Sequence, residues 1–208
     1  MISKTAIKKI IAALEAEYPD ALCSLEYDVP WQLLFATRLS AQCTDERVNR
    51  VTPALFSRYP TLEAFAVADI LDVEDLVHSC GFYHHKAADL IACAQMLLSD
   101  FNGVLPDTME QLLKLPGVGR KTANIILGDI YNKPAVVTDT HCIRLANRMG
   151  MTVNTDPYKV ELDLAAIIPP AKQSNFCHRL VLHGRASCTA RKPNCPDCCL
   201  TTLCPKLI

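Results

Sequence analysis

The spacing of apolar residues restricts this chain to one class of fold. Across most of its 208 residues, apolar side chains recur at intervals of three and four, and strict alternation of apolar and polar residues is almost absent. Clear examples lie within residues 7–14, 33–36, 90–98 and 125–130. This period is typical of amphipathic helices, whereas strands would alternate at every second residue. We therefore predict an all-α fold of about ten short helices.

Residues that begin and end helices lie between these apolar runs. Thr61 is placed as a helix N-cap, and Gly103 is placed as a helix end. A further helix is expected to start near Asp107, and another at Pro157, with Asp156 as its N-cap. No repeat, low-complexity segment or flexible linker interrupts the chain, so any two domains are expected to pack together.

Composition predicts a folded, soluble and intracellular protein. Half of the residues are hydrophobic, which is enough to bury a core at this length. The N-terminal residues mix lysines with apolar residues at helical spacing and lack a cleavage site, and no later stretch is long enough to span a membrane. We predict a cytoplasmic protein without a membrane partner, whose 11 cysteines are reduced thiols or metal ligands.

The formal net charge of −1 hides an uneven distribution along the chain. Residues 1–110 contain 8 Lys or Arg and 16 Asp or Glu, a net charge of −8, whereas residues 111–208 contain 13 and 6, a net charge of +7. The basic second half is compatible with a surface that binds a polyanion such as nucleic acid. Two solvated faces of opposite sign would give the same count, so charge alone does not decide the function.

Four cysteines are crowded near the C-terminus. Cys188, Cys195, Cys198 and Cys204 are separated by six, two and five residues in a loop-like, proline-containing stretch. Thiolates this close repel one another unless a metal neutralises them. Zinc sites usually have two C-x-x-C pairs and this run has one, so a 4Fe-4S cluster fits better than zinc or no metal. Cys199 is expected not to be a ligand, and the remaining cysteines are expected to be small buried residues.

The segment LPGVGRKTANIIL, residues 115–127, interrupts the helical pattern with two glycines and then starts another helix. Gly117 and Gly119 are expected to adopt backbone conformations that other residues resist, which predicts a helix, a tight hairpin and a second helix. Unpaired backbone N–H groups of such a hairpin can bind a nucleic-acid phosphate without reading base sequence. An ordinary turn between helices would also explain the glycines.

Lys121 is placed in the first turn of that second helix, where the helix dipole disfavours a cation. This field, the adjacent Arg120 and partial burial are expected to favour the neutral, nucleophilic amine. Further along, Asp139 follows the apolar residues 135–137 and precedes a helix, which it can cap while also accepting a proton. A phosphate contact for Lys121 and a simple N-cap for Asp139 remain the alternatives.

Several motifs together resemble the endonuclease III family, in the helix-hairpin-helix DNA glycosylase superfamily. They are LSAQCTD at residues 39–45, GFYHHKA at 81–87, LPGVGRKTAN at 115–124, DTH at 139–141 followed by Arg144, LHGR at 182–185, and the cysteine run. Individually several of these motifs are weak signals. In this order, and across nearly the whole chain, they are specific.

The resemblance implies a two-domain architecture. Residues 20–131 would form a six-helix barrel domain that contains the helix-hairpin-helix. Residues 1–19 and 132–208 would form a discontinuous helical domain that ends in the iron–sulfur cluster loop. Double-stranded DNA with damaged bases or abasic sites would be the partner, and the protein would act as a monomer.

The resemblance also implies the chemistry. The enzyme would extrude a damaged nucleotide, because a base inside the duplex is out of reach. Lys121 would attack C1′ of the sugar, expel the base and form a Schiff base, and β-elimination would then cut the strand. Asp139 would help to deprotonate Lys121 and stabilise the cationic sugar. A lysine at this position is typical of bifunctional glycosylases that remove oxidised pyrimidines.

The remaining implied site residues contact DNA. Gln42 would fill the gap left in the duplex, and Phe82 would act as the wedge at a position where the family commonly has leucine. His84 replaces the usual asparagine, and both differences bear on the contacts to the opposite base. Core packing for Phe82 and a solvated turn for His84 are the alternatives. Backbone and phosphate contacts are expected from Gly117, Val118, Gly119, Arg120, Arg144, Arg191 and Lys192.

Two other functions are compatible with parts of the sequence. A monofunctional adenine or mismatch glycosylase would share the scaffold and the cluster, but that branch lacks the amine of Lys121. A non-catalytic iron–sulfur protein that binds DNA or transfers electrons would need only the cysteines and the hairpin, which would leave Lys121 and Asp139 without a role. Trapping with borohydride separates these cases.

Overall fold

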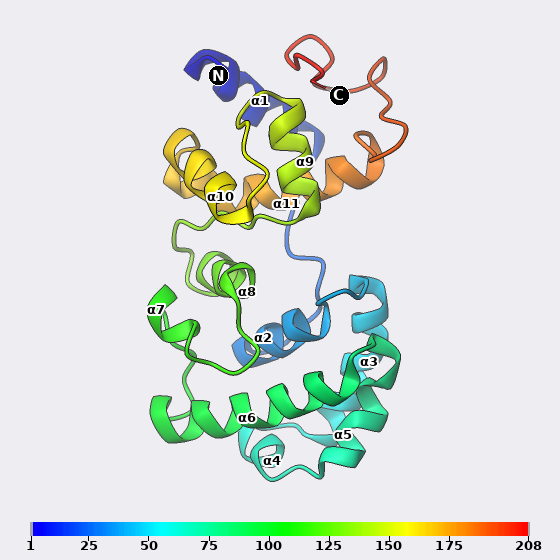
Figure 1. The fold of residues 1–208 in the computed structure, drawn as a ribbon, viewed down its shortest axis with the longest axis vertical. Helices are drawn as coiled ribbons and strands as arrows, with labels where there is room; N and C mark the ends of the chain where they lie inside the picture. The colour runs from blue at the N-terminus through cyan, green and yellow to red at the C-terminus, as the bar shows by residue number, and fades with distance from the viewer. Residues whose placement is uncertain (1, 208) are drawn as a thin grey trace. The chain divides into compact units, whose positions relative to one another are not determined.

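The computed structural model describes residues 2–207 and contains helices, turns and loops, with no strand in that range (Figure 1). The predicted all-α class is confirmed. The chain divides into two compact units. The central unit is Ser24–Tyr131, and the terminal unit combines Met1–Cys23 with Asn132–Ile208. None of the described helices has both the length and the hydropathy that a membrane span requires.

The central unit is built around α6, its longest helix (Figure 1). Its elements are α2 Pro30–Leu39, α3 Asp45–Arg58, α4 Leu62–Ala66, α5 Ile70–Val77, a 3-10 turn His78–Cys80, α6 Tyr83–Phe101, α7 Met109–Leu112, α8 Arg120–Ile125 and a π-helical turn Ile126–Ile130. Helices α2, α4 and α5 all pack against α6. The predicted boundaries at Thr61 and Gly103 are confirmed, since Thr61 caps α4 and Gly103 follows the left-handed C-cap of α6.

An aromatic cluster fills the core of the central unit. Its members are Trp31, Phe35, Phe56, Tyr59 and Phe65, contributed by α2, α3, α4 and the residue after α3. Most of these rings meet edge to face, the geometry that aromatic quadrupoles favour. The cluster therefore gives the short helices α2 and α4 tertiary support that their length alone would not provide.

The terminal unit packs its helices around α11 (Figure 1). Its elements are α1 Lys4–Glu17, α9 Thr140–Arg148, α10 Pro157–Ile167, a 3-10 turn Pro170–Lys172 and α11 Gln173–Ala186. Asp156 caps α10 by accepting from the N–H of Lys159, as predicted. Helices α1 and α9 both contact α11, and residues after α11 form the turns that carry the clustered cysteines.

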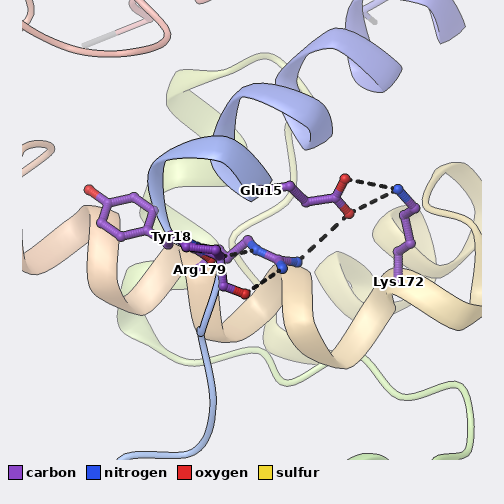
Figure 2. Close-up of polar contacts among 5 residues, drawn as sticks. Glu15, Tyr18, Lys172 and Arg179 are labelled. Carbon is purple, nitrogen blue, oxygen red and sulfur yellow. Dashed lines mark hydrogen bonds and ion pairs between the residues drawn. The ribbon is translucent and has the colours of Figure 1, made fainter.

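A buried arginine fixes the end of α1 to α11 (Figure 2). The Nε atom of Arg179 donates to the carbonyl of Tyr18 at 3.1 Å, and Nη2 donates to the carbonyl of Pro19 at 3.5 Å. Glu15 accepts from Lys172 at 2.9 Å and lies 3.8 Å from Nη1 of Arg179. These bonds satisfy carbonyls that lie beyond the last helical turn and place Tyr18 against α11.

Candidate functional site

A glycine turn joins α7 to α8 and forms the hairpin. The N–H of Val118 donates to the carbonyl of Leu115 at 3.1 Å, and Gly117 has a φ of +71°. Glycine adopts such a positive φ at little cost, whereas a side chain resists it. Gly119 is the N-cap residue of α8, so Arg120 begins the helix. The predicted order of helix, tight turn and helix is confirmed.

Two details of the hairpin differ from the sequence-based expectation. Gly119 has a φ of −98° and a ψ of 176°, an extended conformation that any residue can adopt, so the expectation of an unusual backbone there was wrong. Lys121 is exposed, so the expectation of partial burial was also wrong. The next positions, Thr122 and Ala123, take the inward face of this short helix and turn Lys121 toward solvent. An exposed amine is accessible to a substrate.

An ion pair lies directly behind the hairpin. The Nε atom of Arg38, on α2, donates to Oδ2 of Asp89, on α6, at 2.7 Å. A Cβ atom at Gly117 would lie 2.6 Å from the Arg38 Nε and 2.7 Å from the Asp89 Oδ2. Gly117 is therefore required both by its φ and by the close approach of the ion pair.

Gln42 and Phe82, the residues assigned to the DNA gap and wedge, both lie in turns of the central unit. Gln42 has a φ of +54° in the turn between α2 and α3, and Phe82 has a φ of +50° as the N-cap of α6. Both side chains are exposed, and Phe82 is 63% exposed, an unusual position for an aromatic side chain. Core packing, the alternative for Phe82, does not occur in the structure.

His84 lies in the first turn of α6, with one ring nitrogen close to a carboxylate of the central unit. Its Nδ1 atom lies 2.7 Å from Oε2 of Glu74, while the side chain remains 66% exposed. The ring is therefore anchored at one nitrogen and open to solvent elsewhere. The contact of His84 with the opposite base stays a prediction.

Asp139 is the N-cap of α9. Its Oδ1 atom accepts from the N–H of Cys142 at 2.7 Å, and the preceding run Ala135–Val137 is buried. The capping role is confirmed, and it involves only Oδ1 in the described bond. Because the buried run and the cap fix the backbone on both sides, the carboxylate is held in a defined position.

The four clustered cysteines line one hollow in the terminal unit. Cys188, Cys195, Cys198 and Cys204 all border it, and it encloses about 450 Å³ of empty space, including its open mouth. Burial, together with the nearby thiols of Cys188 and Cys195, raises the pKa of the Cys198 thiol above its ordinary value. Burial and the same neighbouring thiols also raise the pKa of Cys204. Four thiolates here would need a cationic centre to hold them together.

Several donors point at the sulfur atoms of this hollow. Arg148 Nη1 lies 3.3 Å from Sγ of Cys188. The backbone N–H of Leu200 donates to Sγ of Cys198 at 3.3 Å, and the N–H of Lys206 donates to Sγ of Cys204 at 3.4 Å. Such donors stabilise thiolates and are typical of the surroundings of iron–sulfur clusters.

His183, which sequence reasoning did not single out, also reaches the sulfur atoms. Its Nε2 atom lies 3.4 Å from Sγ of Cys198, and its Nδ1 atom lies 3.1 Å from the Tyr18 hydroxyl. The atoms of His183, Cys198 and Cys199 that could bind a metal lie within 4.8 Å of one another. Burial lowers the pKa of His183. The position of His183 seven residues after Phe176, on the same buried helix face, was the signal that sequence reasoning could have used.

The cysteine loop and the DTH and LHGR motifs are joined by Arg144. Its Nη2 atom donates to the carbonyls of Gly184 and Cys188, at 3.1 and 3.0 Å. A Cβ atom at Gly184 would lie 2.5 Å from Nδ1 of His141, which explains why glycine occupies this position. A phosphate contact by Arg144 stays a prediction, because the described bonds of this side chain hold the protein's own loop.

Arg191 and Lys192, also predicted to contact phosphates, are exposed on the loop between the first two cysteines. The loop is held locally, since the Thr189 hydroxyl donates to the Lys192 carbonyl at 2.7 Å and accepts from its N–H. Both charges are therefore carried on a constrained segment next to the cysteine hollow. Arg148 braces the same segment by donating to the carbonyls of Thr189 and Ala190.

Comparison with known proteins identifies the family. Residues 35–170 match the HhH-GPD superfamily of base excision DNA repair proteins. The chain is 49% identical over 211 residues to endonuclease III of Synechocystis sp., covering 99% of this chain and 96% of that protein. The chain belongs to the endonuclease III family. Endonuclease III of Bacillus subtilis is 38% identical over 188 residues, 90% of this chain and 86% of the relative.

Solved structures of endonuclease III share this fold. A trapped endonuclease III–DNA covalent intermediate, in an estranged-adenine complex, matches with a TM-score of 0.92 and 38% identity, over 99% of this chain and 97% of that chain. A non-covalent endonuclease III–DNA complex matches with the same score and coverage. A thermostable thymine-DNA glycosylase, at 20% identity and a TM-score of 0.87 over 97% of this chain and 96% of that one, shares the fold.

Proposed function

We propose that this endonuclease III family member is a bifunctional DNA glycosylase and abasic-site lyase of base excision repair. Its substrates are oxidised pyrimidines and abasic sites in double-stranded DNA. The observation that carries the proposal is the exposed Lys121, placed immediately after the glycine hairpin in a chain whose relatives include one trapped covalently on DNA. An amine in that position is suited to attack an extruded sugar.

The proposed reaction needs no external oxidant or reductant. The neutral amine of Lys121 attacks C1′ of the extruded nucleotide, and the C1′–base bond breaks as the base leaves with the electron pair and takes up a proton. Opening of the sugar ring gives a protonated Schiff base between Nζ and C1′. Removal of a proton from C2′ then breaks the C3′–O3′ bond, and water hydrolyses the Schiff base to release the lysine.

Asp139 is the proposed proton acceptor and electrostatic partner in this reaction. A carboxylate can accept the proton that the Lys121 ammonium loses before the neutral amine attacks, and it can stabilise the positive charge that develops on the sugar. Its Oδ1 atom is used by the cap of α9, which fixes the side chain without using Oδ2 in that bond. The cap and the catalytic role are therefore compatible in one residue.

DNA binding combines a phosphate grip with insertion into the duplex. The backbone of residues 117–119, with Arg120, would hold phosphates, and the exposed Arg191 and Lys192 would add charge without reading sequence. Gln42 and Phe82 would enter the space vacated by the extruded nucleotide. The protein would act as a monomer, in the cytoplasm. The central unit would be the barrel module predicted for residues 20–131, and the terminal unit the cluster domain.

A 4Fe-4S cluster is the proposed occupant of the cysteine hollow. The fit rests on four cysteines that line one hollow and on the donors that lie near the sulfur atoms of three of them. Cys188, Cys195, Cys198 and Cys204 would be the ligands, with Cys199 left outside the set. When bound, the cluster supplies a cross-link that stiffens the loop. Arg191 and Lys192 would then contact the phosphates from a fixed position.

Borohydride trapping tests this function directly. The protein incubated with an abasic-site duplex and borohydride is expected to give a covalent protein–DNA species, because the reductant converts the Schiff base to a stable amine. Lys121→Gln is expected to bind the duplex and give no such species, while the matched control Lys114→Gln, an exposed lysine before the hairpin, keeps it. If the parent protein releases the damaged base but is not trapped, this would indicate a monofunctional glycosylase. If the parent protein is inactive, this would indicate a non-catalytic DNA-binding protein.

A further inference from the structure

One lysine of the central unit is buried without a carboxylate partner. Lys86, on α6, has no exposed surface. Its Nζ atom donates to the carbonyls of Leu39 at 2.7 Å, Ala41 at 2.8 Å and Cys80 at 2.9 Å. These three backbone carbonyls are the hydrogen-bond acceptors that the structure gives for its ammonium group. Burying a lysine in this way is costly, so its position calls for an explanation.

The three carbonyls lie in, or at the helix ends that lead into, the two turns that carry the proposed DNA-inserting residues. Leu39 and Ala41 lead directly into Gln42, and Cys80 is two residues before Phe82. Because a single nitrogen bonds carbonyls from both turns, it fixes the two backbones relative to each other.

Both turns also need external support. Gln42 has a φ of +54° and Phe82 a φ of +50°, in the left-handed region that is unfavourable for residues with side chains. Such conformations persist only where surrounding bonds hold them. Lys86 supplies three of these bonds, one to the residue immediately before Gln42.

We propose that Lys86 is a positioning residue that holds Gln42 and Phe82 in register for simultaneous entry into the duplex. The inference rests on the proposed function, because it assigns a shared support to the two side chains that would fill the vacated space. A lysine suits this role, since its compact ammonium has three donors that can point at three carbonyls. An apolar side chain in its place would leave all three without this partner.

The test measures insertion separately from folding. The substrate is an abasic-site duplex with 2-aminopurine opposite the site, whose fluorescence rises when that base is unstacked. Cleavage is measured in single turnover, and the concentration of active protein is determined by borohydride trapping. Lys86→Met is expected to lower the cleavage rate per active molecule and the fluorescence change, by about 10- to 100-fold for the rate. The control Lys8→Met, which removes an exposed lysine, keeps the parent values.

A double-mutant comparison separates positioning from a general structural role. In a protein that carries both Gln42→Ala and Phe82→Ala, adding Lys86→Met is expected to change the rate by less than about twofold, because the side chains that it positions are absent. If Lys86→Met lowers the cleavage rate in that background by as much as it does in the parent protein, the proposal is overturned. A parent-like rate per active molecule for Lys86→Met would also overturn it.

Folding is monitored by thermal melting. If Lys86→Met does not fold, Lys86→Gln, which retains a shorter donor, is measured in both backgrounds and decides by the same two criteria. A parent that forms no trapped species would refute the proposed function and this inference with it. A parent that is trapped, combined with an additive Lys86 effect, would refute the positioning role alone.

Discussion

Replacing Gly117 by alanine tests whether the hairpin is held by its contact with the ion pair behind it. The new Cβ atom would sit 2.6 Å from Nε of Arg38 and 2.7 Å from Oδ2 of Asp89. Both distances are shorter than van der Waals contact, and the two atoms belong to the pair that bonds at 2.7 Å. Either the ion pair separates or the hairpin moves away from α2 and α6.

The expected loss of stability has two parts. Alanine at a φ of +71° costs about 1–2 kcal/mol, because its side chain crowds the neighbouring carbonyl in the left-handed region. Disrupting the Arg38–Asp89 pair adds about 1–2 kcal/mol, a value lowered for solvent screening because the side chains are 20% and 29% exposed. The sum of about 2–4 kcal/mol corresponds to a fall in Tm of roughly 5–15 °C for a chain of this size.

Calorimetry and DNA binding together check this prediction, with Gly119→Ala as the matched control. A Cβ atom at Gly119 would meet nothing within 4 Å, and the φ of −98° suits alanine. This control is expected to lose at most about 1 kcal/mol, from the poorer N-cap. Gly117→Ala is expected to weaken binding of abasic duplex at temperatures where it is still folded, because the hairpin amides are displaced. Equal destabilisation by the two substitutions would refute the reasoning.

Three further predictions concern the terminal unit. Asp139→Asn is expected to slow base release about 100-fold or more, measured in single turnover. DNA affinity is expected to change little, because asparagine still caps α9. Equal losses in rate and affinity would argue against a catalytic role for Asp139. His183→Leu removes the ring nitrogen that lies 3.4 Å from Sγ of Cys198. In the tautomer with a proton on Nε2 this nitrogen donates to the sulfur, so the substitution is expected to lower the reduction potential of a bound 4Fe-4S cluster in voltammetry, and an unchanged potential would exclude that bond. Hydrogen bonds from Thr152 and Asn154 hold the pKa of Asp163 below its ordinary value. The ionised carboxylate therefore stabilises the folded state at neutral pH, and this contribution disappears as the pH falls through the lowered pKa. Acid unfolding of Asp163→Asn is therefore expected to depend less on pH than that of the parent.

The local features of the fold could be predicted because each depends on neighbouring residues. Thr61, Asp139 and Asp156 accept bonds from N–H groups three residues later, so the cap is contained in the sequence motif. The same holds for Gly117, whose positive φ follows from a tight turn between two helical patterns. The four cysteines of the C-terminal run likewise border one hollow, as residues close together in one loop can.

The features that sequence reasoning missed depend on residues far away in the chain. The exposure of Lys121 is set by which face of α8 turns inward, and a six-residue helix shows too little periodicity to reveal this. The extended backbone of Gly119 could not be predicted, since both glycines belong to the same motif and the motif does not distinguish the conformation of Gly119 from that of Gly117. The bonds from Arg144 to Gly184 and Cys188 span 40 and 44 residues.

Two buried cations show that a charged residue in the sequence does not always lie on the surface. Lys86 and Arg179 are both buried, and both donate to carbonyls at or just beyond helix ends, those of Leu39, Ala41 and Cys80 for Lys86 and those of the residues after α1 for Arg179. In each case the segment runs out of helical partners, so a long cationic side chain supplies the missing donors. Lys86 also falls four residues before Leu90 on the buried face of α6, so a lysine inside an apolar stripe was the available signal. Such a lysine is better interpreted as a hydrogen-bond donor to unpaired backbone carbonyls than as an interruption of the helical pattern. The turns that it bonds are then candidates for a functional site.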